Sequence, residues 1–221
     1  SSNIAIGHNS LAANTTGTRN VAVGVSALDA AQTANDNVMI GFVAGSAITS
    51  GNDNVALGSY TMQDNTSGYE NVAVGHKSLF ENTTGIRNTA LGRGALYTNT
   101  TASYNTAVGQ NSLFDNTTGY NNTAVGRASS YRNTTGINNT TVGYNSLYSN
   151  TTGLSNVAVG SSALNAATTA DQNTGIGYNA LILTTTGGAN TVVGSYGMQA
   201  NTTGASNTAV GYLALDANTT A

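Results

Sequence analysis

The sequence predicts an all-β fold: a β-solenoid, or parallel β-roll, of 13 coils with 17 residues in each coil. The first observation behind this prediction is a glycine that recurs at every 17th residue, without insertion or deletion, through all 221 residues. The second is a short β-branched segment before each of these glycines. The third is a pair of turn signals in every copy, which leave no room for a helical hairpin. The recurring glycines are Gly7, Gly24, Gly41, Gly58, Gly75, Gly92, Gly109, Gly126, Gly143, Gly160, Gly177, Gly194 and Gly211.

The first element of each copy is a strand that ends at the recurring glycine, which we number position 0. In all 13 copies position −4 is Asn, position −3 is Val, Ile or Thr, and position −1 is Val, Ile or Leu. Position −2 is usually Ala. The alternation predicts a strand whose branched side chains point into the coil, with the small residue on a second face that is covered at close range. The glycine is expected to end the strand in a turn or bulge with positive φ.

The second element is an inward anchor followed by a corner. Position +4 carries Leu or Met in 11 of the 13 copies, and the exceptions are Gly45 and Ser130. Positions +7 to +10 then read Asn-Thr-Thr-Gly or a close variant, which predicts a corner with Asn and Gly in the left-handed region. Alanines replace part of this motif in residues 27–36 and 163–172, so that a short helical turn is an alternative there.

The invariant Asn at position −4 is expected to form a structural ladder rather than a catalytic site. Equivalent residues lie one above another in a stack of coils, and Asn side chains in such a column hydrogen-bond from coil to coil. The predicted ladder consists of Asn3, Asn20, Asn37, Asn54, Asn71, Asn88, Asn105, Asn122, Asn139, Asn156, Asn173, Asn190 and Asn207.

Composition argues against several classes of partner. Charged residues make up 7% of the chain and the formal net charge is −3, which provides no basic stripe for nucleic acid and no polybasic membrane patch. Cysteine is absent, so disulfides and thiolate metal sites are excluded. The sequence shows no membrane-spanning apolar run and no signal peptide. Because the chain begins and ends in phase with the repeat, we expect residues 1–221 to be a single repeat array from a longer fibre, with caps and any membrane anchor elsewhere.

The titratable residues do not indicate an enzyme. His8 and His76 both follow a recurring glycine, and the nine carboxylates are scattered over repeat positions that vary freely. No nucleophile and base recur together, so no catalytic residues are expected. No repeat position is acidic throughout, as a calcium-binding roll would require, so neither a metal nor a cofactor is expected.

One variable position carries a run of aromatic residues. Position +5 is aromatic in five successive copies, and the 17-residue spacing places these side chains one above another. Such a column is a candidate platform for glycan rings or a receptor surface. The alternative is that the rings stack on one another and on neighbouring protomers and so seal the edge of the roll. The candidate binding residues are Phe80, Tyr97, Phe114, Tyr131 and Tyr148.

The predicted core of each coil is thin. One coil supplies only about three sizeable apolar side chains, while 17 residues must be ordered. The molecule would therefore gain from covering one face with a partner, and the small residue at position −2 offers a flat surface for close packing. Homo-oligomerisation is expected, most simply with cyclic symmetry.

The strand half of the repeat resembles a known family. Residues 71–79 (Asn-Val-Ala-Val-Gly-x-x-Ser-Leu), 105–113 and 3–11 are similar to the YadA-like head repeat of trimeric autotransporter adhesins and of related phage-type tail fibres. The resemblance covers every copy, but the family's usual repeat is shorter and lacks the Leu-x-x-Asn-Thr-Thr-Gly extension. It implies a left-handed parallel β-roll, a homotrimer and adhesion by a fibre outside the cell, on a cell surface, virion or injection machine. It does not supply a receptor.

Two other functions remain open. The first is an ice-binding (antifreeze) β-solenoid, because threonine is abundant, charge is low and the repeats are regular. Against it, the Thr pair of the corner is adjacent and would point to opposite sides of a strand, and the strand alternates Thr with Val. The second is a structural spacer that binds no ligand.

Overall fold

The computed structural model describes residues 2–220 and contains thirteen three-residue strands and no helix in that range. The chain divides into two compact units, residues 1–110 and residues 111–221, which are built from the same repeat. The first unit contains β1 (Ile4–Ile6), β2 (Val21–Val23), β3 (Val38–Ile40), β4 (Val55–Leu57), β5 (Val72–Val74), β6 (Thr89–Leu91) and β7 (Thr106–Val108). The second contains β8 (Thr123–Val125), β9 (Thr140–Val142), β10 (Val157–Val159), β11 (Thr174–Ile176), β12 (Thr191–Val193) and β13 (Thr208–Val210).

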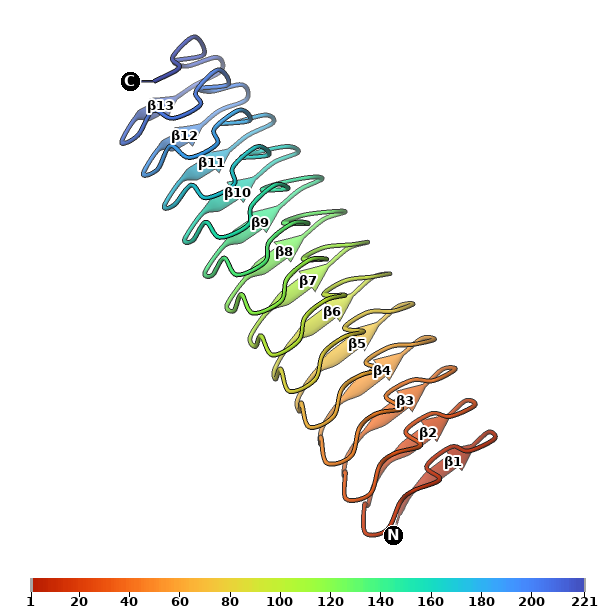
Figure 1. Cartoon of the computed structure of the whole chain (residues 1–221). Coiled ribbons are helices and arrows are strands. Elements are labelled where there is room, and N and C mark those ends of the chain that lie inside the picture. The colour runs from red at the N-terminus through yellow and green to blue at the C-terminus, as the bar shows by residue number, and fades with distance from the viewer. Residues whose placement is uncertain (1, 221) are drawn as a thin grey trace. The chain divides into compact units, whose positions relative to one another are not determined.

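Within each unit, every strand pairs in parallel with the strand of the next coil (Figure 1). The register is offset by one repeat, so Ala73 of β5 lies opposite Ala90 of β6, and Ala158 of β10 lies opposite Gly175 of β11. Equivalent residues of successive coils therefore form columns. This arrangement confirms the predicted all-β parallel β-solenoid with one 17-residue repeat in each coil.

The strands face the opposite way from the sequence-based prediction. Ala73 at position −2 of β5 is fully buried, whereas the flanking Val72 and Val74 are only half-buried. The prediction that the branched residues point into the coil is wrong. The reason is space: a Cβ built on Gly175 at position −2 would lie 3.3 Å from Cγ of Leu164, so the +4 anchor already fills the interior beneath the strand. Only a small side chain fits between them.

The +4 anchors are confirmed as the second inward contact of each coil. Leu or Met at this position is fully buried in nine coils, and these side chains are among the largest buried groups of the molecule. Since the coil is narrow, this one column supplies most of the apolar volume of the core. The nine residues are Leu28, Met62, Leu79, Leu96, Leu113, Leu147, Leu164, Leu181 and Met198.

Exceptions to the repeat compensate one another in size. In the coil of β3, Met39 replaces the small residue at position −2 and Gly45 replaces the +4 anchor. A Cβ on Gly45 would lie 2.7 Å from Sδ of Met39, so the methionine occupies the space of the missing leucine. In the second unit, Thr141 of β9 replaces alanine beside Ser130, with the two hydroxyls 3.0 Å apart and buried. In the coil of β3 a longer side chain replaces the missing anchor, whereas in the coil of β9 two buried hydroxyl groups pair with each other.

The turns use positive φ at the predicted glycine and also at positions that were not predicted. The recurring glycine has φ between 123° and 146°, as expected. A second type of left-handed residue occurs at positions −5, +2 and +4, where non-glycine residues have φ between 46° and 62°. Asn and Gly of the Asn-Thr-Thr-Gly corner are not among the positive-φ residues, so that detail of the prediction is wrong. Residues 27–36 and 163–172 form turns and not helical turns.

One column of Asn side chains occupies position −4 of every copy, and a second occupies position +7 in nine of the 13 copies. In the column at position −4, Oδ1 of Asn54 accepts hydrogen bonds from the backbone N and Nδ2 of Asn71, both at 3.1 Å. A second ladder at position +7 was not predicted, and there Nδ2 of Asn82 donates to Oδ1 of Asn65 at 2.8 Å. The two ladders converge on the carbonyl of Gly85, which accepts from Asn71 at 2.9 Å and from Asn82 at 3.1 Å. These bonds give the invariant Asn at position −4 a structural role, because buried polar groups require hydrogen-bond partners.

Candidate binding surfaces

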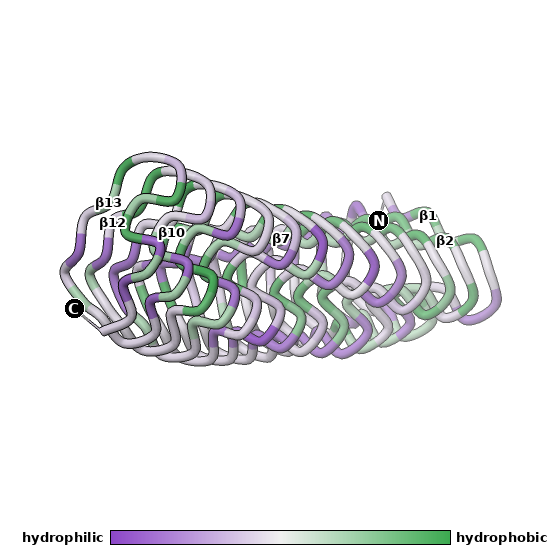
Figure 2. Tube along the Cα trace, turned by 90° about the horizontal axis from the view of Figure 1, so that it is seen from above, coloured by the Kyte–Doolittle hydropathy of each residue, from purple (hydrophilic) through white to green (hydrophobic). Residues whose placement is uncertain are grey.

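The outer side of the strands is the main exposed apolar surface of each unit. We call this surface, formed by the first and third residue of every strand, the strand face. Figure 2 shows hydrophobic segments recurring at equivalent places in successive coils. From β1 to β5 both columns of the strand face are aliphatic, whereas the first residue is Thr in five of the six strands of the second unit. Ile40 and Val193 are each 40% exposed, so apolar side chains lie open on both units.

A row of tyrosines follows the strand face in the second unit. Position +1 reads Tyr144, Ser161, Tyr178, Ser195 and Tyr212 in successive coils. We call Tyr144, Tyr178 and Tyr212 the tyrosine row, and their side chains are 47%, 48% and 71% exposed. Sequence reasoning did not single out this row, although the alternation of Tyr and Ser at one repeat position is visible in the sequence.

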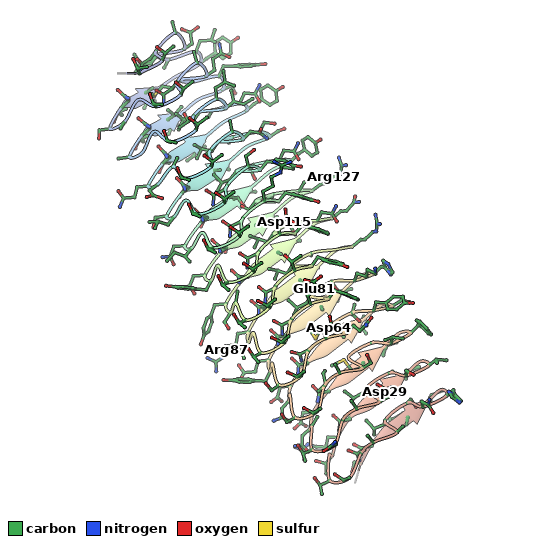
Figure 3. All side chains as sticks on the ribbon, in the orientation of Figure 1. Asp29, Asp64, Glu81, Arg87, Asp115 and Arg127 are labelled. Atoms are coloured by element: carbon green, nitrogen blue, oxygen red, sulfur yellow. The ribbon has the colours of Figure 1, made fainter. Side chains whose placement is uncertain are left out.

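Neighbouring side chains hold the tyrosine row in place. Tyr196 at position +2 packs edge-to-face against Tyr178, with ring centroids 5.2 Å apart, and against Tyr212, with centroids 6.1 Å apart. The guanidinium carbon of Arg127 lies 5.4 Å from the ring centroid of Tyr144, and Figure 3 places Arg127 at the outer edge of the coils. These contacts restrict the rings while leaving about half of Tyr144 and Tyr178, and most of Tyr212, open to solvent.

The predicted aromatic column at position +5 is brought together by stacking within each unit. Phe80 and Tyr97 lie 5.0 Å apart at an interplanar angle of 13° in the first unit. In the second unit, Tyr131 lies 5.1 Å from Phe114 at 3° and 5.2 Å from Tyr148 at 16°. All five side chains are half-buried. Because rings in these stacks cover one another's faces, they offer mainly their edges to solvent.

Cations pack on these stacks. In the first unit, Nζ of Lys77 lies 5.2 Å from the ring centroid of Phe80 and 5.9 Å from that of Tyr97. In the second unit, the guanidinium of Arg132 lies 5.7 Å from the ring of Tyr148. Burial raises the pKa of Tyr131, and the nearby Asp115 carboxylate raises this pKa further. Burial also raises the pKa of Asp115, against the attraction of Arg132.

Two surface ion pairs link neighbouring coils of the first unit. Arg19 pairs with Asp36 and Arg87 pairs with Glu70, each with an N–O distance of 2.6 Å. Arg87 also donates a hydrogen bond to the Tyr104 hydroxyl at 3.1 Å. The hydrogen bond from each arginine lowers the pKa of its carboxylate partner. Exposed pairs of this kind contribute little to stability.

Residues 2–220 contain no candidate metal-binding cluster. Within that range no three His, Cys, Asp or Glu side chains are grouped so that they could hold a metal ion. The same residues include no helix that is long and apolar enough to cross a membrane.

A shallow depression of about 360 Å³ lies at positions +5 and +6 of three successive coils of the first unit. Figure 3 shows two of its carboxylates, Asp29 and Asp64, on the same side of this unit. It is lined by Asp29, Ala30, Ser46, Ala47, Gln63 and Asp64.

The fold and these surfaces define a β-solenoid repeat protein with exposed aliphatic and aromatic columns. Comparison with protein-family models, with curated proteins and with solved structures gave no match for this chain.

Proposed function

We propose that the chain is a structural and adhesive segment of a homotrimeric extracellular fibre. The observation that carries this proposal is the exposed strand face. In the first unit it is a stripe of seven strands, and coils about 4.8 Å apart make such a stripe roughly 30 Å long. Soluble monomers rarely expose continuous apolar surfaces of this kind, which are typical of interaction sites.

The shape of the strand face favours cyclic association. It is only two side chains wide, and it follows the direction in which the coils stack. Copies that meet along one common axis cover such a narrow stripe completely, and three copies around the axis close the assembly. The resemblance of the strand repeat to YadA-like heads supports the same arrangement and the location of the fibre outside the cell, on a cell surface, virion or injection machine.

The mass of the protein in solution tests the homotrimer. One chain has a mass of 22.2 kDa, so sedimentation equilibrium is expected to return three times that value. A Val74→Asp variant places a charge in the strand face and is expected to dissociate the assembly, because an unpaired buried charge is costly. Thr84→Asp, at an exposed position away from the strand face, is the matched control and should keep the wild-type mass. A monomeric wild type overturns the proposal.

Ice binding is a second candidate because of one observation in the second unit. The first and third residues of its strands point to the same outer face, so Thr and aliphatic side chains such as Thr191 and Val193 form a regular, exposed array. Such an array presents hydroxyl and methyl groups together. Thermal hysteresis of the purified protein is the measurement: activity that Thr191→Lys abolishes supports ice binding, and its absence leaves the adhesive or the ligand-free spacer function.

A further inference from the structure

We infer that the tyrosine row of the second unit is a binding site for a linear β-1,4-linked glycan chain. This inference rests on the adhesive part of the proposed function and names the chemical class of its ligand. It also moves the ligand surface away from the aromatic column at position +5, where stacked rings cover one another's faces.

The spacing of the row is the first argument. Tyr144, Tyr178 and Tyr212 are separated by 34 residues, which is two coils, or about 10 Å at the usual distance between neighbouring strands. A β-1,4-linked glycan turns over at each sugar, so it presents the same ring face once in every disaccharide. The length of that disaccharide is close to the two-coil separation, so every second sugar meets a tyrosine.

The chemistry of the row is the second argument. The face of an aromatic ring carries negative charge density, and the face of a pyranose ring presents C–H bonds with slight positive character. Stacking of the two is favourable and requires no ionic group, which suits a surface that carries few charges. The serines between the tyrosines, Ser161 and Ser195, are half-buried and supply hydroxyl groups within the row.

The third argument is that the rings are open and already positioned. About half of the Tyr144 and Tyr178 side chains is exposed, whereas the rings at position +5 are stacked on one another and half-buried. Tyr196 packs edge-to-face between Tyr178 and Tyr212, which limits the rotation of both rings before a ligand arrives. Such preorganisation lowers the entropic cost of binding.

Isothermal titration with hexasaccharides tests the inference on the whole chain. Cellohexaose and chitohexaose share the β-1,4 linkage and distinguish a glucose from an N-acetylglucosamine ligand. Maltohexaose has the α-1,4 linkage, which coils the chain, and should not bind. The variant Tyr144→Ala/Tyr178→Ala/Tyr212→Ala is expected to lose at least about tenfold in affinity. Tyr120→Ala, which removes a tyrosine that is 44% exposed in another column of the same unit, is the control and should bind as wild type does.

A second variant keeps the test decisive if the alanine variant folds poorly. Ser161→Tyr/Ser195→Tyr adds rings at the intervening coils, so that the tyrosines stack on one another as they do at position +5. Affinity for the β-1,4 hexasaccharides is expected to fall although aromatic surface has been added. No binding by the wild type, or equal binding by this variant or by a folded triple-alanine variant, overturns the inference. A trimer that binds no glycan overturns only this inference, whereas a monomer that binds overturns only the homotrimer.

Discussion

At the scale of single residues, the molecule repeats backbone conformations that are individually unfavourable. Leu79 at position +4 has φ 50°, in the left-handed region that most side chains avoid at a cost of roughly 1–2 kcal/mol. Its backbone N donates to the carbonyl of Ala95 in the next coil at 2.9 Å, and its side chain is fully buried. The inter-coil hydrogen bond and the burial together offset the strain, and the other fully buried +4 anchors share the positive φ.

The recurring glycine should be the least replaceable residue of the repeat. Gly75 has φ 123°, and a Cβ at this position would collide with the backbone of Gly92 in the next coil. Gly75→Ala is expected to destabilise the protein by more than about 2 kcal/mol, measured by chemical denaturation. Gly94→Ala is the control: Gly94 has φ 65° at position +2, where Ala128 stands in another coil, and it should cost about 1 kcal/mol.

Two carboxylates should affect stability in opposite directions as the pH changes. Burial raises the pKa of Asp115, so the folded state takes up its proton more readily than the unfolded state does. Stability from this group is present below the ordinary aspartate pKa and is lost as the pH rises through the raised value. Asp115→Asn is therefore expected to raise the thermal midpoint at pH 7 and to leave it unchanged at about pH 3.

Glu70 provides the opposite case in the same experiment. The hydrogen bond from Arg87 lowers its pKa, so its contribution is present above the ordinary glutamate pKa and is lost as the pH falls through the lowered value. Glu70→Gln should slightly lower the midpoint at pH 7, because the pair is exposed, and the difference should fade in acid. If both variants changed the thermal midpoint at pH 7 in the same direction, the opposite pKa shifts of Asp115 and Glu70 would be contradicted.

At the scale of the elements, the strands and their period could be predicted, but their orientation could not. Alternation of Val, Ala and Val identifies a strand, yet the same pattern fits a strand with Ala inside or Ala outside, because side chains alternate with period two. The orientation is decided by Leu164 and the other +4 anchors, which occupy the coil interior and admit only a small residue opposite them. That is a contact within the tertiary structure, which the local pattern does not contain.

Substitutions that exchange the large and the small core residue of the β3 coil, Met39 and Gly45, test whether the two positions share one space. Met39→Ala removes the side chain that fills the coil of β3 and should cost about 2–4 kcal/mol, because a cavity remains. Gly45→Leu alone should also destabilise the protein, because its Cβ would already lie 2.7 Å from Sδ of Met39. The double variant restores the pattern of the other coils. Its loss of unfolding free energy should therefore be smaller than the sum of the two single losses by at least about 1 kcal/mol. Additive effects would show that the two side chains do not share one space.

At the scale of the whole molecule, the constant positions of the repeat differ from the positions of the proposed binding surface. The invariant Asn at position −4 and the recurring glycine form a ladder and the turns, the nearly constant +4 anchor fills the core, and all of these are scaffold. The aromatic column at position +5 was visible in the sequence, but whether its rings stack on one another or face solvent depends on side-chain geometry. The tyrosine row at position +1 was missed because its three members are separated by serines, and exposure distinguishes it only once the coils are folded.

A single cysteine tests both the orientation of the strand and the proposed covering of its outer face. The chain has no native cysteine, so Val74→Cys introduces a single thiol on the strand face. Under mild oxidation we expect copies linked by a disulfide, because Val74 of neighbouring protomers would meet at the common axis, whereas Thr84→Cys should give none. A Val74→Cys protein that stays unlinked and reacts as readily with a maleimide as Thr84→Cys does would show that the strand face is not covered by other copies of the chain.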